Sequence, residues 1–447
     1  MSQSEENMLI FAILDMIWNM TTAGSKFSFD SKATRSASAS HVNFRKHKKS
    51  EGLDLYLFLS FLSFETYYLI FAWSNSLIPI ITVVNFAILL ILNIRISNSK
   101  LTDIGSPSNQ MKLTTSLFLL FLIYGVVIGI SNFGMVTVAI SLRIILYPYL
   151  VFRVIKTFSS SQLNRVTIFL GYTLFLNAVA STFQVIVGVD YLINNFSSLQ
   201  YGLSIREIGN DIRPPGLMRT NVHLGLYGAI FALIVLNFDN QRQIISKLQK
   251  MIFLFSALTC MFLSTSRSAY LVFILGWAMY KSKSLGGKLL GKVVIPLITT
   301  GITFFVFSPE IRVLFQRILV WGDISSLTTF VGNGIGSIGG ATASRFSSGS
   351  SLNYRTGYSE AIFADNYYLS LLFQFGWLIG FALILTLLLA SLRLIQKGSK
   401  ERKPFLKGIV LGYLVVANFL DIGEYYGASI LICIGIIALS RPKKASA

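Results

Sequence analysis

Long apolar segments separated by short polar loops make up most of this chain. An apolar segment of about 20 residues is long enough to cross a membrane as a helix. The sequence contains twelve such segments, at about 53–73, 76–94, 113–131, 134–152, 167–188, 220–238, 249–265, 267–281, 289–308, 366–390, 406–421 and 425–440. We therefore predict an all-α, polytopic integral membrane protein with about 12 transmembrane helices.

The apolar stretch 249–281 is open to two interpretations. It could form one helix with Arg267 at its middle, or two shorter helices that meet at a turn over Ser264–Ser268. A single helix would place the basic loops Lys281–Lys292 and Arg393–Lys407 on the outer side, which breaks the preference of basic loops for the cytoplasm. We therefore predict two helices.

Basic residues divide the loops into two sets and fix the topology. One set contains all the loop lysines, and such loops face the cytoplasm. The other set contains arginine and no lysine: Arg206, Arg213, Arg219, Arg267, Arg312, Arg317, Arg345 and Arg355. Both chain ends are then expected inside. Arginine grips phosphate oxygens with a rigid planar fork, so the outer face is expected to bind a ligand that carries phosphate.

The predicted domain organisation has three parts. Residues 1–52 form a cytoplasmic N-terminal tail with room for an interfacial helix, 53–440 form the transmembrane domain, and 441–447 form a cytoplasmic C-terminal tail. Two outer loops, 189–219 and 309–365, are long, and long loops often carry function. The second includes the glycine-rich stretch Gly332–Gly340.

Composition agrees with a membrane protein. Hydrophobic residues make up 53% of the chain and charged residues only 13%, against about 25% charged in soluble domains. The net charge of +19 would suggest a nucleic-acid partner in a soluble protein, but cytoplasmic loops and anionic lipid account for it here. Cys260 and Cys433 lie within apolar segments, so neither a disulfide framework nor a cysteine metal site is expected.

Arg213 and Arg219 flank Pro214-Pro215-Gly216 directly before the helix predicted at 220–238. A helix start offers free N–H groups and the positive end of the helix dipole, and both favour an anion. Thr220 or Asn221 can cap this helix, and His223 follows within its first turn. The alternative interpretation is an ordinary helix start with a snorkelling arginine.

Arg267 lies in Ser264-Thr265-Ser266-Arg267-Ser268, between two apolar segments. A charge at this depth usually faces a cavity or a partner, and the flanking hydroxyl groups suit a phosphate. It could instead only anchor the turn. Within the predicted helices, Arg143 and Glu65 either satisfy each other or other polar groups in the bundle, or they line a substrate path.

Asp365 precedes the helix predicted at 366–390. Its carboxylate could cap that helix, or it could act as a general base. Glu360 is a second candidate base, and Asn366 is a further candidate site residue. The sequence has no Asp-x-Asp motif, no Walker A motif and no Gly-x-Ser-x-Gly motif, and His41, His47 and His223 are too scattered for a metal site. We therefore expect neither a metal nor a cofactor.

These segments together resemble the O-antigen ligase and polymerase superfamily, most clearly over about 205–390. The likeness rests on four segments in order: Arg213 to Gly225, the Ser266-Arg267-Ser268-Ala269 turn, Gly332 to Gly336, and Asp365-Asn366-Tyr367-Tyr368-Leu369 followed by Gly376 and Gly380. Many relatives, the ligases above all, have histidine where this chain has Asp365. This departure favours a polymerase over a ligase.

The resemblance implies metal-independent, inverting glycosyl transfer at the outer face of the bacterial cytoplasmic (inner) membrane. The donor would be an oligosaccharide on undecaprenyl pyrophosphate, and the product a surface polysaccharide such as O-antigen, capsule or exopolysaccharide. Arg213, Arg219, Arg267 and Asn221 would bind the pyrophosphate, and Asp365 would activate a hydroxyl of the glycan acceptor. Arg143, His223, Glu360 and Asn366 are secondary candidates. Membrane lipid, a flippase and chain-length regulators are the further expected partners.

Other functions stay open at this point. An O-antigen ligase would transfer glycan from the same lipid carrier to an acceptor. A transporter or flippase would also have about twelve helices with buried charges such as Arg143 and Glu65, but it does not need the long loop 309–365. A peptidoglycan glycosyltransferase of the shape, elongation and division type and a non-catalytic scaffold are two more possibilities.

Overall fold

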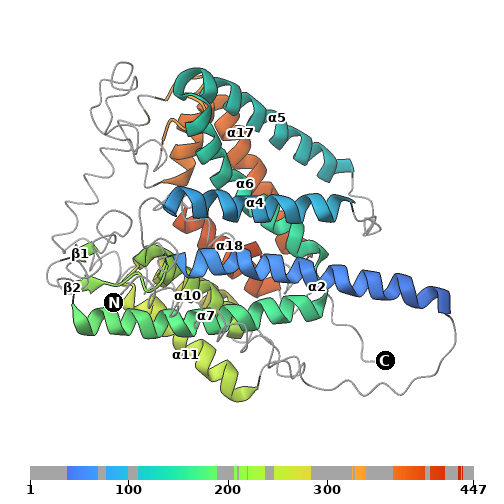
Figure 1. The fold of residues 1–447 in the computed structure, drawn as a ribbon. Helices are drawn as coiled ribbons and strands as arrows, with labels where there is room; N and C mark the ends of the chain where they lie inside the picture. Colours follow the sequence, from blue (N-terminus) through green and yellow to red (C-terminus); the bar gives the residue numbers. More distant parts are fainter. Residues whose placement is uncertain are drawn as a thin grey trace.

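The structure, a computed structural model, describes residues 38–68, 77–98, 109–188, 206–208, 211–218, 220–236, 246–282, 325, 328–338, 366–397, 403–417, 431–433 and 435. This part of the chain is predominantly helical, as predicted, and includes one two-stranded hairpin (Figure 1). The helix predicted at 289–308 and most of that at 425–440 lie outside the described residues.

The helices follow the predicted apolar segments closely. Those in the first part of the chain are α2 (Ser38–Thr66), α4 (Leu77–Asn98), α5 (Asn109–Phe133), α6 (Met135–Thr157) and α7 (Ser160–Val187). Those in the second part are α10 (Asn221–Leu236), α11 (Lys247–Leu263), α12 (Arg267–Ser282), α17 (Tyr367–Lys397) and α18 (Lys403–Val416). The strands β1 (Arg206–Ile208) and β2 (Asp211–Arg213) lie in the predicted outer loop 189–219.

The apolar helices identify a membrane protein. Three of the described helical stretches are long and apolar enough to cross a membrane, by length and composition: Ser116–Phe133, Ser160–Val187 and Tyr367–Leu389. Shorter apolar stretches are Val83–Ile96, Asn221–Leu236 and Arg267–Ala278. The full set of twelve membrane-spanning helices stays a prediction.

The helix α2 begins earlier than expected. It starts at Ser38 rather than near residue 53, so it includes part of the predicted N-terminal tail. In Figure 1 its N-terminal half extends beyond the neighbouring helices α4 and α7. Apolar periodicity marks only the part of a helix that packs against apolar surroundings, which is why the sequence pattern missed the polar extension.

The predicted division of 249–281 into two helices is confirmed. α11 ends at Leu263, a turn follows over Ser264 and Thr265, and α12 begins at Arg267. At its other end, α11 begins with a capping box between Ser246 and Gln249. This arrangement satisfies the first backbone N–H groups of the helix.

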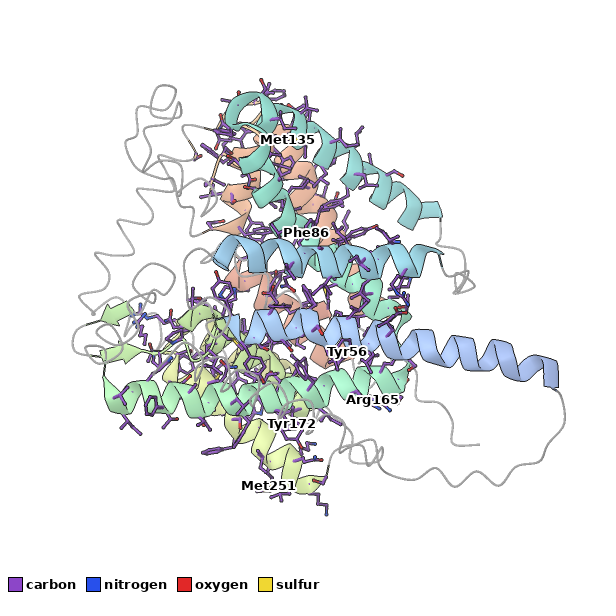
Figure 2. All side chains as sticks on the ribbon, viewed as in Figure 1. Tyr56, Phe86, Met135, Arg165, Tyr172 and Met251 are labelled. Atoms are coloured by element: carbon purple, nitrogen blue, oxygen red, sulfur yellow. The ribbon has the colours of Figure 1, made fainter. Side chains whose placement is uncertain are left out.

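Helix α10 lies at the centre of the main hydrophobic core. Nearly all its residues are buried, whereas membrane-facing helices such as α5 expose large apolar side chains. Aromatic rings fill the space between helices: Phe253 of α11 packs against Tyr172 of α7 and Phe231 of α10. Figure 2 labels Tyr172 on α7, on the side of α11, and Met251 near the start of α11. A helix buried on all sides is a rigid support for the residues at its start.

Candidate functional site

The first turn of α10 is capped by Thr220. The Thr220 hydroxyl accepts a hydrogen bond from the backbone N–H of His223 at 3.2 Å and pairs with Nδ1 of His223 at 2.9 Å. Of the two residues predicted as caps, Thr220 is therefore the one used. His223 is 7% exposed, and this contact ties its ring to the cap.

Asn221 links the start of α10 to the turn between α11 and α12. Its side chain is 2% exposed, and Nδ2 donates a hydrogen bond to the backbone carbonyl of Ser264 at 3.2 Å. Its Oδ1 is buried and has no hydrogen-bond partner among the described residues. The structure thus brings together two segments that the sequence marked independently.

A glycine allows this close approach. A Cβ atom at Gly225 would lie 2.3 Å from Oγ of Ser264, 2.9 Å from Cβ of Ser266 and 3.1 Å from Cβ of Ala269. Such separations are below van der Waals contact, so only glycine fits at this position. Gly225 therefore sets the distance between α10 and the start of α12.

The turn itself has an unusual backbone. Thr265 has a φ of +47°, which is rare for a β-branched residue. Oγ of Ser264 donates to the carbonyl of Met261 and accepts from the N–H of Ser266, and these contacts hold the turn. Arg267 follows as the first residue of α12 and is exposed. The starts of α10 and α12, both positive ends of helix dipoles, therefore lie next to each other beside an exposed arginine.

The segment before α10 is held by two amides that the sequence analysis missed. Asn177 of α7 accepts a hydrogen bond from the N–H of Leu217 at 2.9 Å and donates to the carbonyl of Thr66 at 3.2 Å. Gln184, also on α7, bonds both backbone groups of Gly216. Polar side chains inside an apolar segment are costly and usually have a role. That signal could have identified both residues.

The hairpin β1–β2 places two of the outer arginines opposite each other. Its antiparallel register pairs Arg206 with Arg213, Glu207 with Ile212, and Ile208 with Asp211. Arg213 is half-buried at the end of β2, directly before Pro214. The hairpin therefore leads directly into the Pro214-Pro215-Gly216 segment before α10.

Helices α10 and α12 run side by side in the same direction. Gly225 approaches Ala269 near their starts, and a Cβ at Gly276 of α12 would lie 2.4 Å from a methyl carbon of Leu233 in α10. Both starts therefore lie at the same end of the bundle.

Helix α18 packs against α12 in the opposite direction. A Cβ at Gly412 would lie 3.3 Å from Cα of Val272, near the start of α12. Ile409, earlier in α18, lies near the other end of α10, since a Cβ at Gly435 would contact both Ile409 and Ile234. The C-terminal end of α18 therefore lies beside the start of α12.

Helix α17 begins at this same end. The backbone N–H of Tyr367 donates to the carbonyl of Ala417, at the end of α18, at 2.8 Å. Oδ1 of Asn366 accepts hydrogen bonds from the N–H groups of Tyr368 and Leu369, at 3.0 and 3.1 Å. Asn366 is thus the cap of α17, the role considered for Asp365. The starts of α10, α12 and α17 share one end of the bundle.

The half-buried carboxylate Glu65 bonds a neighbouring polar group, one of the two kinds of partner considered for it. Nδ2 of Asn85 in α4 donates a hydrogen bond to Oε1 of Glu65 in α2. Asn85 is 3% exposed. Arg143 is part of α6, and its side chain lies outside the described part of the structure, as do Arg219, Glu360 and Asp365.

The opposite end of the bundle also carries basic residues. Nε of Arg95 in α4 forms an ion pair with Asp54 of α2 at 2.8 Å. Figure 2 shows Arg165 near the end of α7 that is remote from the hairpin. Arg267 and Arg165 are both exposed and therefore make a matched pair for comparing the two ends.

Among the residues that the structure describes, no group of three or more His, Cys, Asp or Glu side chains could hold a metal ion. No protein-family model and no curated protein matches the chain. Function therefore has to be inferred from the residues and their arrangement.

Proposed function

We propose that this chain is a multi-pass protein of the bacterial cytoplasmic membrane that polymerises oligosaccharide repeat units carried on undecaprenyl pyrophosphate. The reaction would be a metal-independent, inverting glycosyl transfer at the outer face. The observation that carries the proposal is the junction of α10 and α12. Asn221 bonds Ser264 there, and two helix starts meet beside the exposed Arg267.

This junction suits a pyrophosphate leaving group. As the bond between sugar and pyrophosphate breaks, negative charge grows on the phosphate oxygens. Helix N-termini and a fixed arginine stabilise that charge more in the transition state than in the ground state. Arg213 and Arg219, which flank the Pro-Pro-Gly segment clamped to α7, would contribute further positive charge.

The acceptor side of the reaction would lie at the start of α17. Asp365 is our candidate general base, and it directly precedes Asn366, the cap of a helix that starts at the same end of the bundle as α12. A base takes the proton of an acceptor hydroxyl as that oxygen attacks the anomeric carbon, and the pyrophosphate departs from the opposite face. The arginines proposed for this site would favour the ionised form of Asp365.

The size distribution of surface polysaccharide in cells tests the proposal. The gene is deleted, and the cells are complemented with the wild type, with Arg267→Ala, or with Arg165→Ala as the matched control at the inner end. We expect long chains with the wild type and the control, and single repeat units with Arg267→Ala at equal protein level.

Two other results would give a different answer. Long chains that stay on undecaprenyl pyrophosphate and never reach the surface acceptor would indicate a ligase. A polysaccharide distribution unchanged by the deletion would reject glycan synthesis and favour a transporter.

A further inference from the structure

Residues 328–338, which we call the strap, enter the helix bundle between α5 and α17. The strap contains Gly332, Gly334 and Gly336, with φ angles of +86°, +90° and +93°. Ile335 is fully buried in a cluster with Leu122 of α5 and with Leu371, Phe375 and Leu383 of α17. The described part of the large outer loop thus includes a segment that is packed inside the bundle.

Helix α17 is interrupted where the strap meets it. Gly376 has a φ of +79° and a ψ of +170°, which are not helical values. In an unbroken helix, the carbonyls of Phe373 and Gln374 would accept hydrogen bonds from residues 377 and 378. Here they accept from the N–H groups of Asn333 and Gly334 in the strap, at 3.0 and 2.8 Å.

The strap also bonds to α5. The N–H of Ile335 donates to the carbonyl of Gly125 at 2.9 Å, Nδ2 of Asn132 donates to the carbonyl of Asn333, and the Tyr124 hydroxyl donates to the carbonyl of Val331. A Cβ at Gly129 would lie 2.3 Å from the carbonyl oxygen of Ile335. Backbone therefore packs directly against backbone on this side too.

These bonds argue against a phosphate-binding role for the glycines. A glycine-rich phosphate cradle needs several backbone N–H groups directed at the ligand. In the strap, the N–H groups of residues 332, 333, 334, 335 and 337 all donate to protein oxygens. The glycines instead allow the backbone of the strap to pack closely against other backbone and to adopt positive φ angles.

The position of the strap also argues against a gate. Its partners lie inside the apolar stretches Ser116–Phe133 and Tyr367–Leu389. Irregular backbone at membrane depth is tolerated where it is buried in protein. If the strap left its place, its N–H groups and the carbonyls of Phe373 and Gln374 would lose their partners in apolar surroundings.

We infer that the strap is a fixed positioning element for the outer half of α17, residues 367–375. It anchors the inner end of this half-helix, while Ala417 of α18 anchors the outer end through Tyr367. Asn366 is thereby held at the level of Arg267. Gly334 and Gly376 are therefore positioning residues. The reaction that they serve is the one given under the proposed function, so this inference rests on that proposal.

A pair of alanine variants of the purified full chain tests this role. Gly334→Ala would place a Cβ 2.3 Å from the backbone nitrogen of Gly129, whereas Gly188→Ala shares a positive φ of +80° but meets nothing within 4 Å. Both substitutions strain the backbone, but only the first displaces the strap. The readouts are binding of undecaprenyl pyrophosphate and the rate of transfer from lipid-linked repeat units extracted from the deletion strain.

We expect Gly334→Ala to bind undecaprenyl pyrophosphate within about twofold of the wild type and to lose about a hundredfold in kcat, since small misplacements of reacting groups have effects of that size. Gly188→Ala should match the wild type in both. Loss of binding by folded Gly334→Ala would mean that the strap cradles phosphate, and an unchanged kcat would mean that it positions nothing. Either result would overturn the inference.

A reversible crosslink provides a second test that does not depend on Gly334→Ala folding. Asn333→Cys is combined with Phe373→Cys, or with Asn132→Cys, in a chain in which Cys260 and Cys433 are replaced by serine. For a fixed strap, the disulfide should form without substrate and leave transfer unchanged. Activity that is lost on oxidation and restored by reductant would reveal a gate, and failure of both pairs to crosslink would show that the strap is not docked.

The two tests separate failure of this inference from failure of the proposed function. A wild-type protein that neither binds undecaprenyl pyrophosphate nor transfers sugar would reject the proposed function. The crosslink yield would then still decide whether the strap is docked.

Discussion

Gln184 and Gly216 are joined by two hydrogen bonds between one side-chain amide and one backbone residue. Nε2 of Gln184 donates to the carbonyl of Gly216 at 2.8 Å, and the N–H of Gly216 donates to Oε1 of Gln184 at 2.9 Å. Gly216 lies between Arg213 and Arg219, and α10 follows directly. This contact therefore fixes the approach of the arginine-bearing segment to the candidate site.

Replacing Gln184 by leucine should disturb that segment. Gln184→Leu removes both bonds and leaves two buried backbone groups without partners, each of which costs about 1–3 kcal/mol of folding free energy. We expect a lower unfolding temperature in detergent and shorter polysaccharide chains in cells. Thr182→Ala on the same helix is the control, since the Thr182 hydroxyl bonds the carbonyl of Ala178 within α7. Equal unfolding temperatures and equal chain lengths for the two variants would contradict the role of the contact between Gln184 and Gly216.

Gly225→Ala should separate α10 from the turn between α11 and α12. The added Cβ would lie 2.3 Å from Oγ of Ser264, a hydroxyl that is itself held by two bonds within the turn. Overpacking of this kind typically costs about 1–3 kcal/mol. Thermal unfolding of the purified protein measures the loss. Gly412→Ala, where the nearest atom lies at 3.3 Å, should be less destabilising. A larger loss of stability for Gly412→Ala than for Gly225→Ala would contradict the close contact at Gly225.

Asn221→Asp should weaken both folding and anion binding. The helix dipole favours an aspartate in the first turn, but this side chain is 2% exposed and donates to the carbonyl of Ser264, so a buried carboxylate in its place should lower the unfolding temperature. The new carboxylate cannot donate to the carbonyl of Ser264, and it would repel a bound pyrophosphate. We expect at least about a tenfold loss in affinity for undecaprenyl pyrophosphate, equivalent to about 1.4 kcal/mol. Retained affinity would place the pyrophosphate elsewhere.

The adjacent residues Asp365 and Asn366 should differ in the effect of their removal. Asn366→Ala removes the cap of α17 and should lower stability by about 1 kcal/mol, whereas Asn366→Asp preserves a capping oxygen. Asp365→Asn should keep the unfolding temperature and abolish transfer, because an amide cannot take the proton of the acceptor hydroxyl. A transfer assay beside thermal unfolding tests both. Normal transfer by Asp365→Asn would assign the base to another residue, with Glu360 the next candidate.

Local patterns in the sequence predicted much of the fold. Runs of apolar residues located the helices, and the distribution of lysine indicated two helices rather than one around Arg267. Cap chemistry marked Thr220 at the start of α10. These features depend on residues close together in the chain, so the sequence shows them directly.

The partners of the polar residues within the helices were not predictable. In the sequence, Asn177 and Gln184 are polar residues of one apolar segment, and Asn85 is a polar residue of another. Their partners are Leu217, Gly216 and Glu65, which lie on other segments of the chain. The sequence indicates that such residues need partners, but not which helices meet.

The sequence by itself determined that this is a helical membrane protein, because hydrophobicity acts on each segment separately. Only the tertiary structure decided that Asn221 reaches Ser264 and that the glycines of the strap pack against α5 and the break at Gly376. These contacts depend on the relative positions of whole helices, which close packing among distant residues sets.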